Sequence, residues 1–387
     1  MARHPDDATL HLLQGDLART HGAADAAVRA YLRVLELDPA AVAARANLGA
    51  VYQDEGRFDE ALRCYDEALG LDPGNLPARF NRALLHLLTG NFVEGLRDYE
   101  LRWNVPELTG GVPRFACPVW DGEPLGGRTI LLQTEQGYGD SLQFARYIPV
   151  VARAAGRVLV HCPPKMQALL QRSFPGVICH TRVEDLPAFD VRAALLSLPR
   201  ILGLRPDAVP TDHPYLRADG AALERRRREL ARRGGRLKVG LCWSTESPTG
   251  QHRSIPAQTL AALGGVPDVE FINLQRGAPA GGRPPLPLVD LPGLADFDDD
   301  AALVKALDLV ITMDTALAHL AGAVGARVWT VLSYPPDWRW GLATGDEGER
   351  TSWYPTMRLF RPARKGAWAE AMDRVGAALG RLAAGTP

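Results

Sequence analysis

A period of 34 residues near the amino terminus restricts the fold of this chain more than any other feature of its sequence. Asp38-Pro39 recurs as Asp72-Pro73, and small, aromatic and helix-terminating residues stand where two antiparallel helices would pack. These residues are Leu48, Gly49, Tyr52, Gly56, Ala61, Tyr65, Ala68 and Pro73. Because one helix pair cannot bury its apolar face alone, we expect several pairs to stack into an array.

Weaker copies of this unit flank it on both sides. One period earlier stand Gly15, Gly22, Ala27, Tyr31 and Pro39, and one period later stand Ala83, Gly90, Gly95 and Tyr99. Degenerate outer copies are typical of the caps of a repeat array. The period and the pattern resemble those of tetratricopeptide repeats, which predicts three repeats in residues 1–105.

The pattern changes after Trp103. The stretch VPELTGGVPRFACPVWDGEPLGG holds too much Pro and Gly for a regular helix, so we expect a linker at residues 106–127. From Arg128 onward, short β-rich runs alternate with helical stretches, which favours parallel strands joined by crossover helices. The alternation weakens and then restarts. It predicts two Rossmann-like α/β lobes, residues 128–235 and residues 236–387 with a C-terminal helix, and a cleft where strands end.

Composition narrows the classes of partner and cofactor. A net charge of -1 over 387 residues gives no reason to expect nucleic acid or an anionic membrane as a partner. The basic run ERRRRELARR is interpreted as a solvated helix face because glutamates flank it. The five cysteines are scattered without a C-x-x-C pair, so we expect reduced thiols, no metal site and no other cofactor. No leader-like segment and no run of eighteen apolar residues is present, which predicts a cytoplasmic protein without a transmembrane segment.

The first motif that suggests chemistry is TEQGYGD, directly after the predicted strand TILLQ. Gln136, Gly137 and Gly139 form a strand-to-helix turn whose backbone can approach a ligand on the acceptor side of the cleft. The motif is not the G-x-G-x-x-G fingerprint, which argues against NAD. Asp140 precedes a helix expected to start near Ser141. It is explained equally well as a helix N-cap or as a base that accepts a proton from an acceptor hydroxyl.

A second motif ends the strand KVGLCW with Ser244, Thr245 and Glu246, and Arg253 follows in a loop. Hydroxyl groups and a guanidinium suit a diphosphate, although a loop arginine is more often merely solvated. We add Gln275, at the end of the run VEFINLQ, to the residues expected to bind the donor nucleotide.

In a third motif, Asp314, Thr315 and Ala316 turn from a buried strand into a helix that carries His319. The positive amino end of a helix favours phosphate groups. His319 lies one turn after Thr315, so its imidazole can reach the same phosphate. A lone histidine on an apolar helix is usually a satisfied core residue, and only its neighbours here favour a binding role.

These motifs together resemble the heptosyltransferase-like GT-B glycosyltransferases, in the bacterial branch that is fused to tetratricopeptide repeats. The resemblance covers nearly the whole chain and rests on EQGYGDSLQFARYIP, RSIP, DTALAHLAGAVGARVW, PDWRWG and WYPTMRLFR, in that order. It implies inverting transfer from a nucleotide-sugar donor without metal. Asp140 matches the family's acidic base, Arg253 its basic phosphate ligand, and Asp314, Thr315, Ala316 and His319 its donor-binding turn.

The chain departs from the family before Trp353-Tyr354-Pro355. The family commonly has Asp-Ser-Pro there, whereas this chain has Arg350-Thr351-Ser352 after the loop ATGDEGE. The identity of the sugar and of the nucleotide base is therefore left open.

The repeats suggest a polypeptide acceptor. Asn47 and Asn81 occupy the same repeat position and resemble the asparagine ladder of the O-linked N-acetylglucosamine transferases, with flagellin one acceptor class implied by the family. Each amide can bind a peptide backbone, or can simply satisfy a helix turn. Two other functions stay open: a non-catalytic scaffold with a vestigial nucleotide-binding domain, and lipopolysaccharide heptose transfer.

Overall fold

The computed structural model of the protein describes residues 7–203, 209–210, 213–245, 248–277, 279, 281–291, 296–343 and 348–385. Glu246 and residues 344–347 of the ATGDEGE loop lie outside the described residues. The chain divides into two compact units. The first comprises the residues up to Val105 together with Tyr334–Leu342, and the second comprises Pro106–Ser333 and the residues from Ala343 onward.

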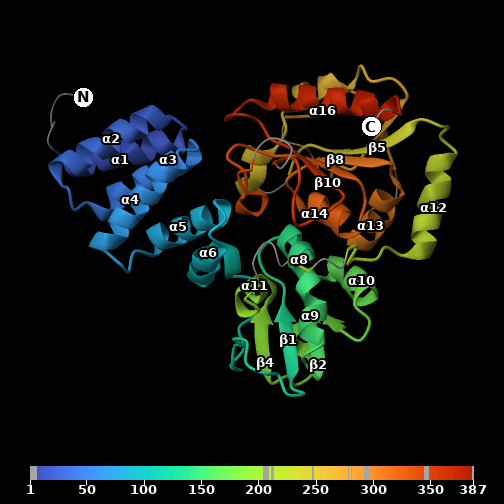
Figure 1. Ribbon diagram of the computed structural model, residues 1–387, viewed down its shortest axis with the longest axis horizontal. Helices are drawn as coiled ribbons and strands as arrows, with labels where there is room; N and C mark the ends of the chain where they lie inside the picture. Colours follow the sequence, from blue (N-terminus) through green and yellow to red (C-terminus); the bar gives the residue numbers. More distant parts are fainter. Residues whose placement is uncertain are drawn as a thin grey trace. The chain divides into compact units, whose positions relative to one another are not determined.

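The first unit consists of stacked antiparallel helix pairs (Figure 1). The pairs are α1 (Ala8–Thr20) with α2 (Ala24–Leu37), α3 (Val42–Asp54) with α4 (Phe58–Leu71), and α5 (Leu76–Leu88) with α6 (Phe92–Tyr99). Within a pair the recurrent glycine lets the helices approach. A Cβ on Gly49 would lie 2.8 Å from the Tyr65 ring, and one on Gly15 would collide with the Tyr31 ring. The periodic glycines and tyrosines are packing partners, and the predicted repeats are confirmed.

A segment from much later in the sequence completes the first unit. Tyr334–Leu342 contains a short 3-10 helix, Trp338–Trp340, that packs against α5. The buried Trp338 ring meets those of Phe92 and Tyr99 edge-on, at centroid distances of 6.4 and 5.8 Å. By sequence this segment falls inside residues 236–387, which we assigned to the second lobe. No periodic pattern in the sequence predicts that this segment packs on the repeats.

The first lobe of the second unit is a four-stranded parallel sheet in the order β3-β2-β1-β4. Its strands are β1 (Thr129–Gln133), β2 (Arg157–His161), β3 (Ile178–His180) and β4 (Val191–Ala194). Its helices are α7 (Pro106–Thr109), α8 (Tyr138–Phe144), α9 (Ile148–Ala152), α10 (Pro164–Ser173) and α11 (Leu198–Ile201).

The second lobe is a six-stranded parallel sheet in the order β10-β9-β8-β5-β6-β7. Its strands are β5 (Leu237–Cys242), β6 (Val269–Asn273), β7 (Leu288–Asp290), β8 (Leu309–Met313), β9 (Val328–Val331) and β10 (Met357–Phe360). Helix α16 (Trp368–Ala383) covers one face of the sheet, whereas α13 (Phe297–Ala306) and α14 (Ala316–Ala323) lie on the other (Figure 1). Because both faces are covered, β8 is apolar and buried along its whole length.

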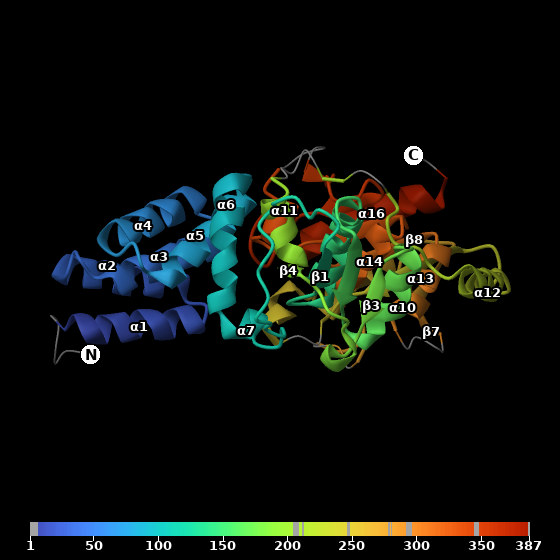
Figure 2. The same cartoon turned by 90° about the horizontal axis from the view of Figure 1, so that it is seen from below.

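The two lobes of the second unit contact each other through helices. Helix α10 lies beside α13 (Figure 2), α8 packs against α14, and Arg172 of α10 forms an ion pair with Asp298 of α13. The basic helix α12 (Gly220–Ala231) also packs against α13. The carboxyl ends of β1 and of β8 each lead into a helix of this contact. This architecture, helical repeats followed by twin parallel α/β lobes of the GT-B type, confirms the predicted fold class.

Candidate functional site

The amino ends of α8 and α14 meet at Gly139. A Cβ on Gly139 would lie 2.9 Å from Cδ2 of His319 and 3.4 Å from the Cα of Ala316. Only glycine leaves room for two backbones to come so close. We expected Gly139 to let the chain approach a ligand, and the structure shows it approaching the opposite lobe. The left-handed residue of this turn is Gln136, with a φ of 57°, whereas Gly137 has a φ of −84°.

Asp140 lies inside α8, in its first turn. The helix begins at Tyr138, earlier than the start expected near Ser141, because Gly137 takes the N-cap position. The interpretation of Asp140 as the N-cap is therefore wrong. Its Oδ2 instead accepts a hydrogen bond of 3.0 Å from the backbone N–H of Gly137, which orients the half-buried carboxylate at the positive end of the helix. Its role as a base stays a prediction.

Asp314 is the centre of a buried polar network at the end of β8. Arg253 Nη1 donates to its Oδ2 at 3.1 Å, and Nε2 of His319 lies 3.8 Å from its Oδ1. On the far side of the imidazole, Nδ1 of His319 lies 2.9 Å from the Tyr354 hydroxyl. Asp314 and His319 are both buried. The structure thus brings together three of the residues predicted to bind the donor, and holds them against one another.

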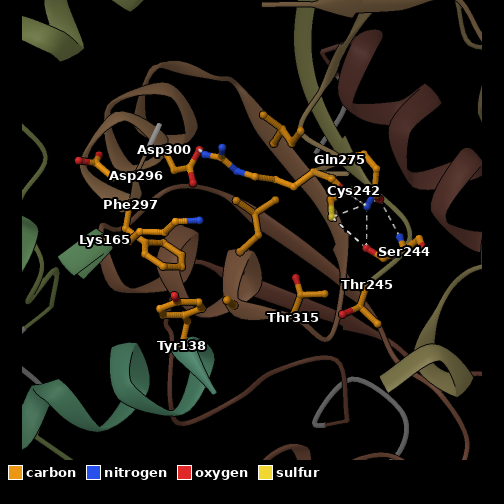
Figure 3. Close-up of a pocket in the computed structure, with 14 residues that line it drawn as sticks. Tyr138, Lys165, Cys242, Ser244, Thr245, Gln275, Asp296, Phe297, Asp300 and Thr315 are labelled. Carbon is orange, nitrogen blue, oxygen red and sulfur yellow. Dashed lines mark hydrogen bonds and ion pairs between the residues drawn. The ribbon is translucent and has the colours of Figure 1, made fainter. Parts of the chain in front are cut away.

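A cavity of about 390 Å³ opens between the lobes beside this network. Figure 3 shows the hydroxyl groups of Ser244, Thr245 and Thr315 on one side of it. The rings of Tyr138 and Phe297, from opposite lobes, lie on the other side with centroids 5.0 Å apart. The cavity therefore has a polar wall and an aromatic wall.

The first residues of α14 complete the polar wall. Thr315 is the N-cap, and Ala316 and Leu317 also line the cavity. The side chain of Thr315 makes no capping hydrogen bond. The positive amino end of α14 therefore borders the cavity, where it favours an anionic group. Arg253, Asp314 and His319 are not part of the cavity wall.

Gln275 lines the cavity and also braces its wall. Its Oε1 accepts from the backbone N–H of Ser244 at 2.9 Å, and its Nε2 donates to the carbonyl of the same residue at 3.0 Å. The amide thereby fixes the turn that follows β5. This bracing role was not anticipated from the sequence, because it depends on the lateral pairing of β5 with β6.

Charged groups line the end of the cavity near the aromatic wall. Lys165 of α10 points into the cavity (Figure 3). Arg276 forms an ion pair with Asp300 of α13. Burial raises the pKa of Asp300, while the guanidinium of Arg276 opposes that shift. This end of the cavity can hold a polar group such as a ribose. The sequence analysis did not predict Lys165, Arg276 or Asp300 as site residues.

Arg146 and Tyr354 also lie close to the predicted site residues, although the sequence analysis did not predict them. Arg146 is buried and lies over the rings of Tyr215, Trp353 and Tyr354, at 4.6, 5.3 and 4.9 Å from their centroids. It also donates to the Trp353 carbonyl at 2.9 Å. Arg146 belongs to the first lobe and Trp353 and Tyr354 to the second, so this contact joins the lobes. The only sequence signal was the presence of these residues in the motifs that carry the family resemblance.

The two repeat asparagines are already engaged within the first unit. Nδ2 of Asn47 donates to Oδ1 of Asp16 at 2.9 Å, and the Tyr31 hydroxyl donates to the same oxygen at 2.7 Å. Asn81 interacts with the Tyr65 hydroxyl. Both amides are half-buried. Asn47 therefore ties the first repeat to the second, and binding of a peptide by either residue stays a prediction.

The described residues contain neither a membrane-spanning helix nor a cluster of metal ligands. No helix in this part of the chain is long and apolar enough to cross a bilayer. Within the same residues, no three His, Cys, Asp or Glu side chains gather in a group suited to a metal ion.

Known proteins resemble separate parts of the chain. Residues 2–42 and residues 42–75 match the family described as Tetratricopeptide repeat. Protein FlbA of Caulobacter vibrioides is 31% identical over an aligned length of 305 residues, and the alignment covers 70% of this chain and 50% of that protein. The chain thus spans about half the length of this curated relative.

Two solved structures show weaker likeness. A glycosyl transferase family 9 protein from Veillonella parvula is 10% identical, with a TM-score of 0.46 over 69% of this chain and 100% of that one. The TPR2B domain of yeast Sti1 is 22% identical, with a TM-score of 0.24 over 26% of this chain and 81% of that one. The matches to residues 2–42 and 42–75 identify the helix pairs formed by these residues as tetratricopeptide repeats.

Proposed function

We propose that the protein is an inverting, metal-independent glycosyltransferase that moves a sugar from a nucleotide-sugar donor to an acceptor hydroxyl. One observation carries this proposal: two helix starts from opposite lobes meet at Gly139 and Ala316 beside a cavity. One of them bears Asp140, and the other presents its amino end to the cavity.

The donor phosphates bind at the start of α14. The helix end supplies the positive end of a dipole at the polar wall. The hydroxyls of Ser244, Thr245 and Thr315 supply hydrogen-bond donors at the same wall. Arg253 is paired with Asp314, the residue directly before Thr315, and its positive charge adds to the potential that favours phosphate at this wall. The positive charge that stabilises the leaving nucleotide comes from these groups, so no metal ion is needed.

The nucleoside lies between the polar wall and the rings of Tyr138 and Phe297. Aromatic faces accept a planar base, and the charged groups of Lys165 and Asp300 border the same end of the cavity. This placement leaves the sugar nearest the meeting point of α8 and α14.

Asp140 is the general base. Its carboxylate accepts the proton of the acceptor hydroxyl while that oxygen attacks the anomeric carbon, and the bond from that carbon to the phosphate oxygen breaks. The nucleotide leaves with the bonding electrons, and the anomeric configuration inverts. Asp140 belongs to the first lobe and the phosphate site to the second, so base and leaving group flank the sugar from opposite sides.

The acceptor is a protein that the repeats recruit, flagellin being one candidate. Tetratricopeptide arrays present a helical groove to an extended chain, and Asn47 and Asn81 lie at equivalent positions of its first helices. A small lipid-linked sugar has no need of such a groove, which disfavours heptose transfer to lipopolysaccharide. Alanine at both asparagines should raise the KM for the acceptor and leave donor hydrolysis unchanged.

A panel of nucleotide sugars, read by thermal shift and by mass of the released nucleotide, tests the activity itself. A donor that both stabilises the protein and is hydrolysed or transferred supports the proposal. Binding of nucleotide without any turnover, in the presence of candidate acceptor proteins, would favour the scaffold function instead.

Asp140→Asn tests the role of the base. The asparagine side chain can still accept the Gly137 N–H but cannot take up the proton, so turnover should fall about 10²- to 10⁴-fold while donor binding and melting temperature hold. Asp219→Asn is the matched control, because Asp219 caps α12 through the Ala222 N–H at 2.7 Å. Near-normal turnover in Asp140→Asn, or a retained anomer in the parent product, contradicts the assignment.

A further inference from the structure

The Tyr354 hydroxyl is one of the most deeply buried polar groups near the site. The side chain is fully buried, with a relative exposure of 0%, and its ring packs on α14. A Cβ on Gly322 of that helix would lie 2.6 Å from ring carbons of Tyr354. The hydroxyl reaches Nδ1 of His319 at 2.9 Å. Gly322 therefore permits the ring to pack closely on α14.

The geometry on both sides of the imidazole favours one position for its proton. Burial raises the pKa of Tyr354 well above its usual value, so the phenol keeps its proton and can donate it to Nδ1 or accept from it. Where the phenol donates, Nδ1 carries no proton and the neutral imidazole bears its proton on Nε2. That nitrogen lies 3.8 Å from Oδ1 of Asp314, and an N–H there attracts the carboxylate, whereas a lone pair would repel it.

The tyrosine is itself held from the other lobe. The guanidinium of Arg146 lies 4.9 Å from the centre of the Tyr354 ring and donates to the neighbouring Trp353 carbonyl at 2.9 Å. A second bond, from Nη2 of Arg146 to the Tyr215 hydroxyl, measures 3.2 Å. The chain of contacts thus runs from the first lobe through Tyr354 and His319 to Asp314, the residue directly before the N-cap of α14.

We propose that Tyr354 is a positioning residue that holds His319 in its Nε2–H tautomer, and thereby keeps Asp314 and the first turn of α14 in place for the donor. The effect on the donor rests on the proposed function, whereas the tautomer does not. His319 in this account acts through Asp314 from behind the cavity wall. The groups that contact phosphate are those of the helix end and the hydroxyls of the polar wall.

The ring nitrogens of His319 test the tautomer without any substrate. The full-length protein is labelled with ¹⁵N-histidine, and His319→Gln identifies the signals of this residue among the 9 histidines. At neutral pH we expect the parent to show a protonated Nε2 and an unprotonated Nδ1. A proton on Nδ1 in the parent, or on both nitrogens, overturns the proposal.

Tyr354→Phe removes the hydroxyl and keeps the ring. We expect the His319 signals to shift toward a mixture of tautomers, and the KM for the nucleotide sugar to rise by up to roughly tenfold with little change in kcat, the size of one buried hydrogen bond. Tyr147→Phe is the matched control, since Tyr147 is also buried, at 1% exposure, and none of the hydrogen bonds described above involves it. Unchanged signals and an unchanged KM in Tyr354→Phe refute the proposal. If the parent turns over no nucleotide sugar, the proposed function fails, while the nitrogen spectra still decide the tautomer.

Discussion

Gly139→Ala should separate the two helix starts at the centre of the site. The added Cβ would meet Cδ2 of His319 at 2.9 Å and the Cα of Ala316 at 3.4 Å. Neither neighbour can yield freely, because the imidazole is held by Tyr354 and the other atom is backbone. Overpacking of this kind costs about 1–3 kcal/mol. The lobes can relieve it only by moving α8 away from α14.

Moving α8 away from α14 should affect the turnover rate more strongly than the stability of the fold. A displacement of about 1 Å between reacting groups costs roughly 10²-fold in rate, so turnover should fall about a hundredfold at a temperature where the variant is fully folded. The assay is release of nucleotide from the donor, with melting measured in parallel. Gly220→Ala is the matched control, since a Cβ there meets nothing within 4 Å. Parent-like melting and turnover in Gly139→Ala would refute the account of this contact.

Three further outcomes are expected. Arg253→Ala should weaken donor binding by about 1.5–3 kcal/mol in calorimetry, the scale of a charged hydrogen bond, and unchanged affinity would mean that the phosphate site is misplaced. Chelation with EDTA should leave turnover intact, since the start of α14 supplies positive potential without a metal, so complete and reversible loss of activity would overturn the metal-independent mechanism. Trp338→Ala should destabilise the repeats by about 3–5 kcal/mol in urea unfolding, because a buried ring against Phe92 and Tyr99 is lost, and parent-like unfolding would contradict its packing role.

Features that repeat along the chain were predictable from the sequence. The repeat period places a glycine against a tyrosine in the first two helix pairs, Gly15 with Tyr31 and Gly49 with Tyr65, and each pair packs by local contacts that the spacing encodes. The alternation of apolar strands and helices likewise predicts two parallel sheets, since crossover helices leave few other topologies. The motifs containing Asp140 and Asp314 could be placed at strand ends for the same reason.

Periodicity and alternation along the chain predict stacked helix pairs followed by two α/β lobes, each with a candidate motif at the end of a strand. Which side chains meet across the fold could not be predicted in this way. Asp140 is a first-turn residue and not an N-cap, Gly139 serves the contact between lobes, and Trp338 belongs to the repeats. These pairings join residues far apart in the chain, and Arg146 meets Trp353 across 207 positions. Periodicity encodes local neighbours, whereas such contacts depend on how whole elements pack, and no spacing in one sequence records that.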